Sequence, residues 1–280
     1  MNFSTFSWLR RATCAAAVAV LTGGCEMLEF SPSDTRGPDE YTNLTQKNLD
    51  KLAARPLAPG DSLRFIFTGD SQRFYDSADK LVESVNRQPG ISFLVIAGDI
   101  SDFGLAREMH WVAERLDRLN VPYLTVVGNH DHVGNGRAAY KKVFGPLNYS
   151  FVYGDTKFTF VDTNSREYNF NGRIPDMDWL RPQLSDLQGA RRQVVMCHVP
   201  PQDGDFDPAL DQPYIRSIAE APQLVFHLNG HRHSYSIGQP FGDGVTYINS
   251  GAFDTDSYVI LTVWNDAANQ PQFRLQRVFF

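Results

Sequence analysis

Three apolar segments that each end in a glycine and a polar side chain restrict how this chain can fold. The segments span residues 63–68, 91–97 and 123–127, and the polar residues that follow the glycines are Asp70, Asp99 and Asn129. The intervals between these polar residues, 70 to 99 and 99 to 129, are 29 and 30 residues. One strand–helix–strand unit has roughly 30 residues. Because the strands of such units run parallel, we expect an α/β fold in which these three side chains meet at one sheet edge.

Helical patterns separate these segments, and further strand patterns follow them. Apolar residues at steps of three and four predict a helix over 105–119, and helices are also expected over 77–88 and 136–144. The remaining predicted elements are a hairpin of strands 149–153 and 157–161, a helix that begins near Asp176, and strands at 193–197, 224–228, 244–249, 257–264 and 272–279. With 42% hydrophobic residues, the chain can bury a sizeable core, and we expect one domain over 61–280.

The first 25 residues have the features of an export signal. Arg10 and Arg11 precede an apolar run over 12–21, which is shorter than the roughly 18–20 residues of a membrane span and is typical of a secretory signal peptide. The following Thr-Gly-Gly-Cys25 resembles a bacterial lipobox, apart from a threonine where leucine is usual. We therefore expect a lipoprotein signal peptide over 1–24, acylation of Cys25 and a polar tether over 25–60. The alternative is an ordinary secretory signal in which Cys25 is incidental.

The lipobox resemblance implies a protein of the bacterial cell envelope, lipid-anchored on the periplasmic or surface side, and Glu26 favours the outer membrane. The three cysteines agree with this, because Cys14 would be removed, Cys25 acylated and Cys197 left without a disulfide partner. The formal net charge is −6 and no Lys/Arg cluster follows the signal, which disfavours nucleic acid as a partner. Membrane contact is expected only through the lipid anchor.

Side chains that can bind metal collect at the ends of the predicted strands. They are Asp70, Gln72, Asp99, Asp102, Asn129, His130, His198, His231 and His233. Carboxylates, imidazoles and amide oxygens suit a borderline divalent cation. Two such cations can hold the attacking and leaving oxygens of a displacement at phosphorus. Each motif alone has another reading, because Gly-Asp after a strand is commonly a turn and two alternating histidines on a strand share a face for packing.

The other histidines are interpreted differently. His227 lies within a predicted strand and is expected in the core, and His110 is expected on a solvated helix face. His132 follows the 128–131 motif directly and is considered as a substrate contact at the mouth of the site, the alternative being no functional role.

Taken together, these blocks resemble the calcineurin-like metallophosphoesterase family from Leu63 to the C-terminus. The matching blocks, in order, are Gly69-Asp70-x-Gln72, Gly98-Asp99-x-x-Asp102, Gly128-Asn129-His130-Asp131, His198 and Gly230-His231-x-His233. The resemblance implies an α/β fold of two mixed β-sheets packed as a sandwich flanked by helices. It also implies metal-dependent hydrolysis of a phosphate ester, either a monoester or a diester, with two divalent ions (Mn, Fe or Zn) as cofactors and a small phosphate ester as the partner.

The resemblance also implies a role for each matched residue. Asp70, Gln72, Asp99 and His233 would hold the first metal, and Asp99 would bridge to a second metal held by Asn129, His198 and His231. A metal-bridging hydroxide would be the nucleophile. His130 would be the general acid that protonates the leaving oxygen, and Asp102 would orient it. Asp131 is expected to support the turn.

Two residues depart from the family pattern. Gln72 stands where most members have histidine, which alters one ligand of the first metal. Phe103 stands where protein phosphatases have an arginine that binds phosphate, which argues against protein-phosphatase activity. Arg73 is considered as a substitute phosphate contact, the alternative being a solvated surface arginine. The competing functional hypothesis is a non-catalytic metal-binding surface lipoprotein that keeps the fold as a binding module.

Overall fold

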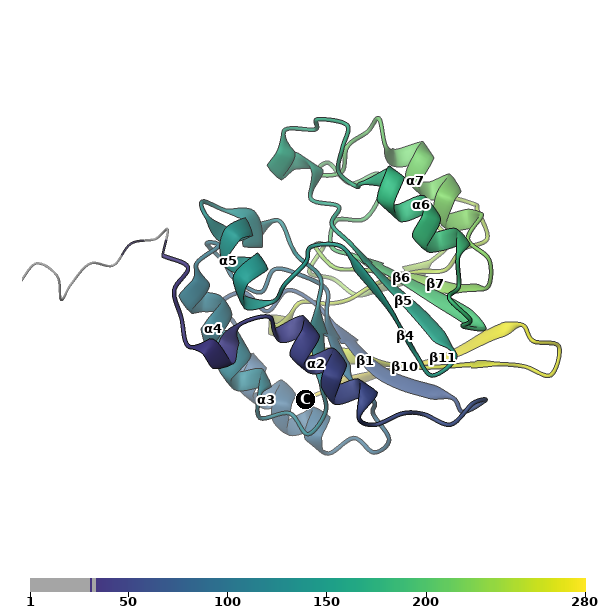
Figure 1. Cartoon of the computed structure of the whole chain (residues 1–280), viewed down its shortest axis with the longest axis horizontal. Coiled ribbons are helices and arrows are strands. Elements are labelled where there is room, and N and C mark those ends of the chain that lie inside the picture. Colours follow the sequence, from purple (N-terminus) through teal and green to yellow (C-terminus); the bar gives the residue numbers. More distant parts are fainter. Residues whose placement is uncertain (1–30, 32–33) are drawn as a thin grey trace, which may run out of the picture.

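The computed structural model of the chain describes residue 31 and residues 34–280. The predicted signal peptide over 1–24 and Cys25 lie outside the described residues. Two β-sheets face each other at the centre of the domain, and helices cover their outer faces (Figure 1). Short 3₁₀ helices occur at Asp39–Tyr41, His130–His132, Ser165–Tyr168 and Phe253–Thr255.

The first sheet combines the three parallel strands with a hairpin from the C-terminus. Its order is β11 (Pro271–Phe279), β10 (Ser257–Asn265), β1 (Leu63–Thr68), β2 (Leu94–Ile96) and β3 (Tyr123–Thr125). Strands β1, β2 and β3 pair in parallel, whereas β10 pairs antiparallel with both β1 and β11. The parallel order confirms the predicted strand–helix–strand repeats and brings the ends of β1, β2 and β3 to one edge.

The second sheet is also mixed. Its order is β4 (Tyr149–Tyr153), β5 (Thr156–Val161), β6 (Arg192–Cys197), β7 (Leu224–Asn229), β9 (Tyr247–Asn249) and β8 (Ser236–Gly238). Strands β4 and β5 form the predicted hairpin, and β5, β6, β7 and β9 run parallel. Two mixed sheets with flanking helices confirm the expected fold class.

Alternation along the strands builds three hydrophobic layers. In β1, Ile66 packs in the cluster of the outer helices, whereas Phe65 and Phe67 pack in the cluster between the two sheets. The outer helices of the first sheet are α3 (Tyr75–Asn86), α4 (Ala106–Leu116) and α5 (Gly136–Val143). Helices α6 (Met177–Ser185) and α7 (Asp211–Ala219) cover the second sheet on the opposite side of the molecule (Figure 1). Successive strand residues point to opposite faces, so each buried strand serves two layers at once.

Helix α2 (Leu44–Ala53) lies within the residues expected to form a tether, yet it packs on the domain. Its apolar residues Leu44 and Leu52 are buried. The buried Asn48 accepts a hydrogen bond from the backbone N–H of Tyr123 at 3.2 Å, which ties α2 to the edge strand β3. The amphipathic spacing of its leucines is the reason, because a helix with an apolar stripe gains stability by burying it.

The two histidines expected to lie outside the site, His227 and His110, have different surroundings. His227 is buried in the core as expected, with Nε2 2.9 Å from the hydroxyl of Tyr214, and burial lowers its pKa to about 3. His110 is half-buried instead of solvated, because its ring packs near the ring of Tyr41 at a centroid distance of 5.9 Å.

Helix α7 and strand β8 were not predicted, since their short segments carry no clear apolar period. Among the residues that the structure describes, no helix has both the length and the apolar content to cross a bilayer.

Candidate active site

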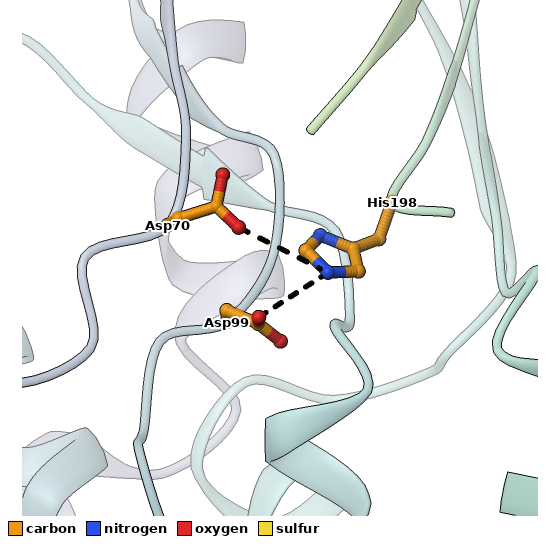
Figure 2. A group of neighbouring side chains, drawn as sticks. All are labelled: Asp70, Asp99 and His198. Carbon is orange, nitrogen blue, oxygen red and sulfur yellow. Dashed lines mark ion pairs between the residues drawn. The ribbon is translucent and has the colours of Figure 1, made fainter. Parts of the chain in front are cut away.

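Three buried side chains form the centre of a metal-binding cluster at the edge where β1, β2 and β6 end. Asp70, Asp99 and His198 point toward one another (Figure 2), and each offers a ligand atom within 4.8 Å of the other two. His198 Nε2 lies 3.3 Å from Asp99 Oδ2 and 4.0 Å from Asp70 Oδ1. The strand ends predicted to meet therefore do meet, and they are joined by a residue from the second sheet.

The other four predicted metal ligands connect directly to this cluster. Asn129 Oδ1 lies 3.0 Å from His198 Nε2 and 3.0 Å from His231 Nδ1. His233 Nε2 lies 3.5 Å from Asp70 Oδ1, and Gln72 Nε2 lies 3.4 Å from Asp99 Oδ2. The structure thus brings all seven predicted ligands into one continuous group, although which of them bind metal stays a prediction.

Backbone strain is concentrated at these residues. Five of the seven predicted ligands have positive φ values: Asp70 (42°), Gln72 (35°), Asp99 (51°), His231 (72°) and His233 (51°). Non-glycine residues enter this left-handed region at a cost of order 1–3 kcal/mol each, and such residues gather at functional sites where the surroundings hold them. The left-handed backbone conformation at these residues points their side chains toward the cluster, whereas a helical or extended backbone would point them in other directions.

The glycines of the motifs are required by close approach between loops. A Cβ on Gly128 would lie 2.1 Å from the backbone nitrogen of Asp99, and one on Gly98 would lie 2.5 Å from Nδ1 of His198. Gly98 also has a φ of 100°. Any larger residue at these positions would push the neighbouring ligands apart.

The electrostatics of the cluster favour a bound cation. Burial would raise the pKa of Asp99, but the imidazolium of His198 beside it lowers that pKa to about 2. Burial would lower the pKa of His198, but Asp99 and Asp70 raise it to about 10. One imidazolium therefore balances one carboxylate, and the second carboxyl group of the cluster lacks a cation of its own.

Asp70 is that second carboxylate, and it provides the test of whether a metal ion fits. Its two oxygens are buried, and no donor among the described residues hydrogen-bonds to either of them. Burial raises the pKa of Asp70 to about 8. Burial therefore disfavours the ionised form of Asp70, and a divalent cation at these oxygens would stabilise it; the surrounding carboxylate, imidazole and amide groups are suited to bind such a cation.

The outer nitrogens of two ligand histidines are held by neighbouring groups. His198 Nδ1 lies 2.6 Å from the carbonyl oxygen of Ala97, and donation there leaves Nε2 facing the cluster. His231 Nε2 lies 3.4 Å from a carboxylate oxygen of Asp203 and 3.7 Å from one of Asp205. Such partners orient metal-binding histidines. Sequence reasoning missed Asp203 and Asp205 as specific contacts, since the loop after His198 has no pattern that fixes its path.

His130 lies beside the cluster as predicted, but its orienting partner differs in detail. Its Nδ1 lies 2.8 Å from the backbone carbonyl of Asp102 and 3.5 Å from the carboxylate of the same residue. The carboxylate pairs more closely with Arg73, at 2.8 Å. Burial would lower the pKa of His130, but the charge of Asp99 and the carbonyl and carboxylate of Asp102 raise it above its ordinary value. The Asp102 carbonyl is thus the nearer orienting group, and the carboxylate positions Arg73.

Asp131 and His132 complete the 128–132 segment. The carboxylate of Asp131 accepts hydrogen bonds from the backbone N–H groups of Ile100, Ser101 and Gly128, which confirms that it supports the turn. The His132 side chain is 4% exposed and faces Asp162, with Nε2 3.7 Å from Oδ2. His132 therefore packs inside the domain and does not offer its ring at the mouth of the site, in contrast to the expectation of a substrate contact.

Comparisons with known proteins agree with this geometry. The model of the calcineurin-like phosphoesterase family matches residues 63–235. An uncharacterized protein of Bacillus subtilis, YvnB, is 20% identical over 218 residues, which cover 68% of this chain and 17% of that protein. The chain therefore spans less than a fifth of the length of this curated relative.

Two solved structures have a similar fold. A purple acid phosphatase from yellow lupin seeds matches with a TM-score of 0.59 and 13% identity, covering 80% of this chain and 55% of that one. A dimetal phosphatase from Danio rerio matches with a TM-score of 0.58 and 13% identity, covering 80% of this chain and all of that one. At this level of identity the likeness concerns the fold.

Proposed function

Because the chain belongs to the calcineurin-like phosphoesterase family, we propose that it hydrolyses a phosphate ester, either a monoester or a diester. The reaction would take place at the Asp70–Asp99–His198 cluster and would use two divalent metal ions. The observation that carries the proposal is the unsatisfied, buried carboxylate of Asp70 beside an ionised Asp99. A structural ion pair would be complete with Asp99 and His198, whereas Asp70 adds a second buried carboxyl group to which no donor among the described residues hydrogen-bonds.

The ligands divide into two sets. Asp70, Gln72, Asp99 and His233 would hold one metal ion, and Asp99, Asn129, His198 and His231 would hold the other. When bound, the cations supply positive charge to the phosphoryl oxygens and make a neighbouring water a better nucleophile at neutral pH. The amide oxygen of Gln72 would be a weaker ligand than the imidazole that is usual at this position, so the first set would depend more on its carboxylates.

His130 would protonate the leaving oxygen. Because its Nδ1–H donates to the carbonyl of Asp102, the transferable proton is the one on Nε2. The charge of Asp99 and the groups of Asp102 raise the pKa of the imidazole, which favours the protonated form that a general acid requires. The side chain is 39% exposed, so an ester can reach it from solvent.

The proposal predicts a strict metal requirement. The full chain, treated with a chelator and then reloaded with Mn²⁺, is expected to regain hydrolysis of an aryl phosphate that the chelated protein lacks, because Asp70 and Asp99 need the cation charge. The measurement is steady-state hydrolysis together with metal analysis of the purified protein. No hydrolysis after reloading, whether or not metal is bound, would favour the non-catalytic binding module.

Arg73 is proposed as a contact to a phosphoryl oxygen. Its guanidinium pairs with Asp102, whose carbonyl lies against His130, and its side chain is 67% exposed beside the site. Arg73→Ala is expected to raise KM by roughly tenfold, the loss of one charge-assisted hydrogen bond. Arg64→Ala, an arginine at the opposite part of β1, is the matched control and should leave KM unchanged. Equal KM values for Arg73→Ala and the unmodified protein would instead favour a solvated surface arginine.

We also propose that the protein is exported and anchored to the outer membrane through acylated Cys25. The support is the sequence alone: a short apolar run followed by a lipobox-like cysteine. Cys25→Ala is expected to move the protein from the membrane fraction to the soluble fraction and to abolish incorporation of labelled fatty acid. Retention of the Cys25→Ala protein in the membrane fraction would contradict the anchor.

A further inference from the structure

A pocket of about 430 Å³ opens beside the metal-ligand loops. It is lined by residues that closely follow His198 (Pro200 and Pro201) and by Asn229 and Arg232, which flank Gly230 and His231. A single side chain joins the pocket to the cluster: one oxygen of Asp203 lies 3.4 Å from His231 Nε2, and the other lies 3.2 Å from Arg232 Nε. A molecule bound to the metal ligands could therefore extend into this pocket.

The walls of the pocket are apolar and partly aromatic. Pro200 and Pro201 line one part, and Ile237 and Phe241 line another. Ile237 on β8 is 47% exposed, so this wall offers a large aliphatic side chain to a ligand in the pocket. The ring of Phe241 stands edge-on to the buried Tyr247, with centroids 4.7 Å apart, and this contact fixes its orientation. Walls of this kind favour a flat group that can stack.

Two of the polar side chains that line the pocket are buried amides. Asn229 and Asn249 are each 3% exposed, and Asn229 Nδ2 donates to Asn249 Oδ1. Asn249 Nδ2 is in turn committed to the carbonyl oxygens of Ser234 and Ser250. Asn229 Nδ2 is thus committed to Asn249, and no hydrogen bond from the described residues occupies Asn229 Oδ1, so this pocket-lining residue offers a free acceptor.

The charged residues that line the pocket restrict the net charge of a ligand that can bind there. No acidic residue lines the pocket, and its one charged lining residue, Arg232, is already paired with Asp203. The pocket therefore suits an uncharged group with a flat ring and a hydrogen-bond donor. A volume of about 430 Å³ lies in the usual range for sites that bind small organic molecules.

We propose that this pocket binds the alcohol part of the phosphate ester and that this part is a nucleoside, whose base stacks on Phe241 and donates to Asn229 Oδ1. The inference rests on the proposed function for the placement of the phosphoryl group on the metal cluster. Base stacking on an aromatic ring and hydrogen bonding of a base to a side-chain amide are the usual means by which proteins recognise bases.

The test uses binding of free adenosine to the full chain, since adenosine has no phosphate and its binding requires neither metal nor turnover. Adenosine is expected to bind in a calorimetric titration, and Phe241→Ala should weaken binding roughly tenfold. Ile237→Asp, at an exposed wall position, should weaken it as well and guards against a folding defect in Phe241→Ala. Phe279→Ala, an exposed aromatic on β11, is the matched control and should bind like the unmodified protein.

Kinetics provide the second readout. The ratio of kcat/KM for adenosine 5′-phosphate to that for methyl phosphate is expected to fall roughly tenfold in Phe241→Ala, mainly through KM. Hydrolysis of methyl phosphate without detectable adenosine binding would overturn the pocket assignment and leave the proposed function intact. Binding of glucose in preference to adenosine would also overturn it. Adenosine binding that depends on Phe241, in a metal-loaded protein that hydrolyses no ester, would support the pocket and contradict the proposed function.

Discussion

Replacement of Asp99 by asparagine is expected to reduce phosphate-ester hydrolysis by roughly a thousandfold and to lower the bound metal content. Asp99 is nearly fully buried, and it lies against both Gln72 and His198. Asparagine has the same shape but removes the negative charge that the proposed cations share. A catalytic cation contributes several kcal/mol to the transition state, and about 1.4 kcal/mol corresponds to a factor of ten in rate.

The measurement pairs steady-state hydrolysis with metal analysis and circular dichroism of Asp99→Asn. The matched control is Asp61→Asn, an exposed aspartate before β1, which removes the same charge away from the site. The folded structure should persist, because an asparagine oxygen can still accept the hydrogen bond from the backbone N–H of His130. Undiminished turnover by Asp99→Asn would contradict the two-metal site.

Replacement of His130 by alanine is expected to reduce kcat by roughly a hundredfold or more for an ester with a poor leaving group, within the range for loss of a general acid. The effect should be much smaller for p-nitrophenyl phosphate, because p-nitrophenolate leaves without a proton. Metal content should stay nearly unchanged, since His130 contacts Asp102 through Nδ1 and is not one of the seven proposed ligands.

The two esters and the metal analysis separate the possible roles of His130. Loss of both metals in His130→Ala would mean that this residue binds metal. Equal losses of kcat for both esters would mean that it does not protonate the leaving oxygen. His110→Ala is the matched control. His110 lies on α4, where its ring packs near the ring of Tyr41, and it is not part of the cluster.

The strand ends and their ligands were predictable because local patterns specify them. In β1 the continuous apolar run of Phe65, Ile66 and Phe67 marks a strand that is buried on both faces, and such a strand must end where its polar residues begin. The glycines that follow allow close approach of the loops, and Asp70 and Asp99 come next. Seven of the nine strand-end residues therefore converge on one cluster, and His130 and Asp102 lie beside it.

Local patterns also misplaced some residues. His132 was expected near the mouth because it follows His130 in sequence, yet the turn of the 3₁₀ helix directs it to the buried Asp162. Asp102 was expected to orient His130 through its carboxylate, yet its carbonyl is closer and the carboxylate pairs with Arg73. Neighbours in sequence can face different surroundings when the backbone turns between them.

The strands, the sheet edge and the chemistry of the metal ligands follow from periodicity, glycine and residue type, which act over a few residues and can be recognised in the chain. The contact of Asp203 with His231 and the pocket beside Arg232 depend on the paths of loops that have no period. Those paths are set by packing between segments far apart in the chain, such as the loop after His198 and strand β8. Long-range packing of this kind leaves no local signal, and it determines which molecule can reach the metal ligands.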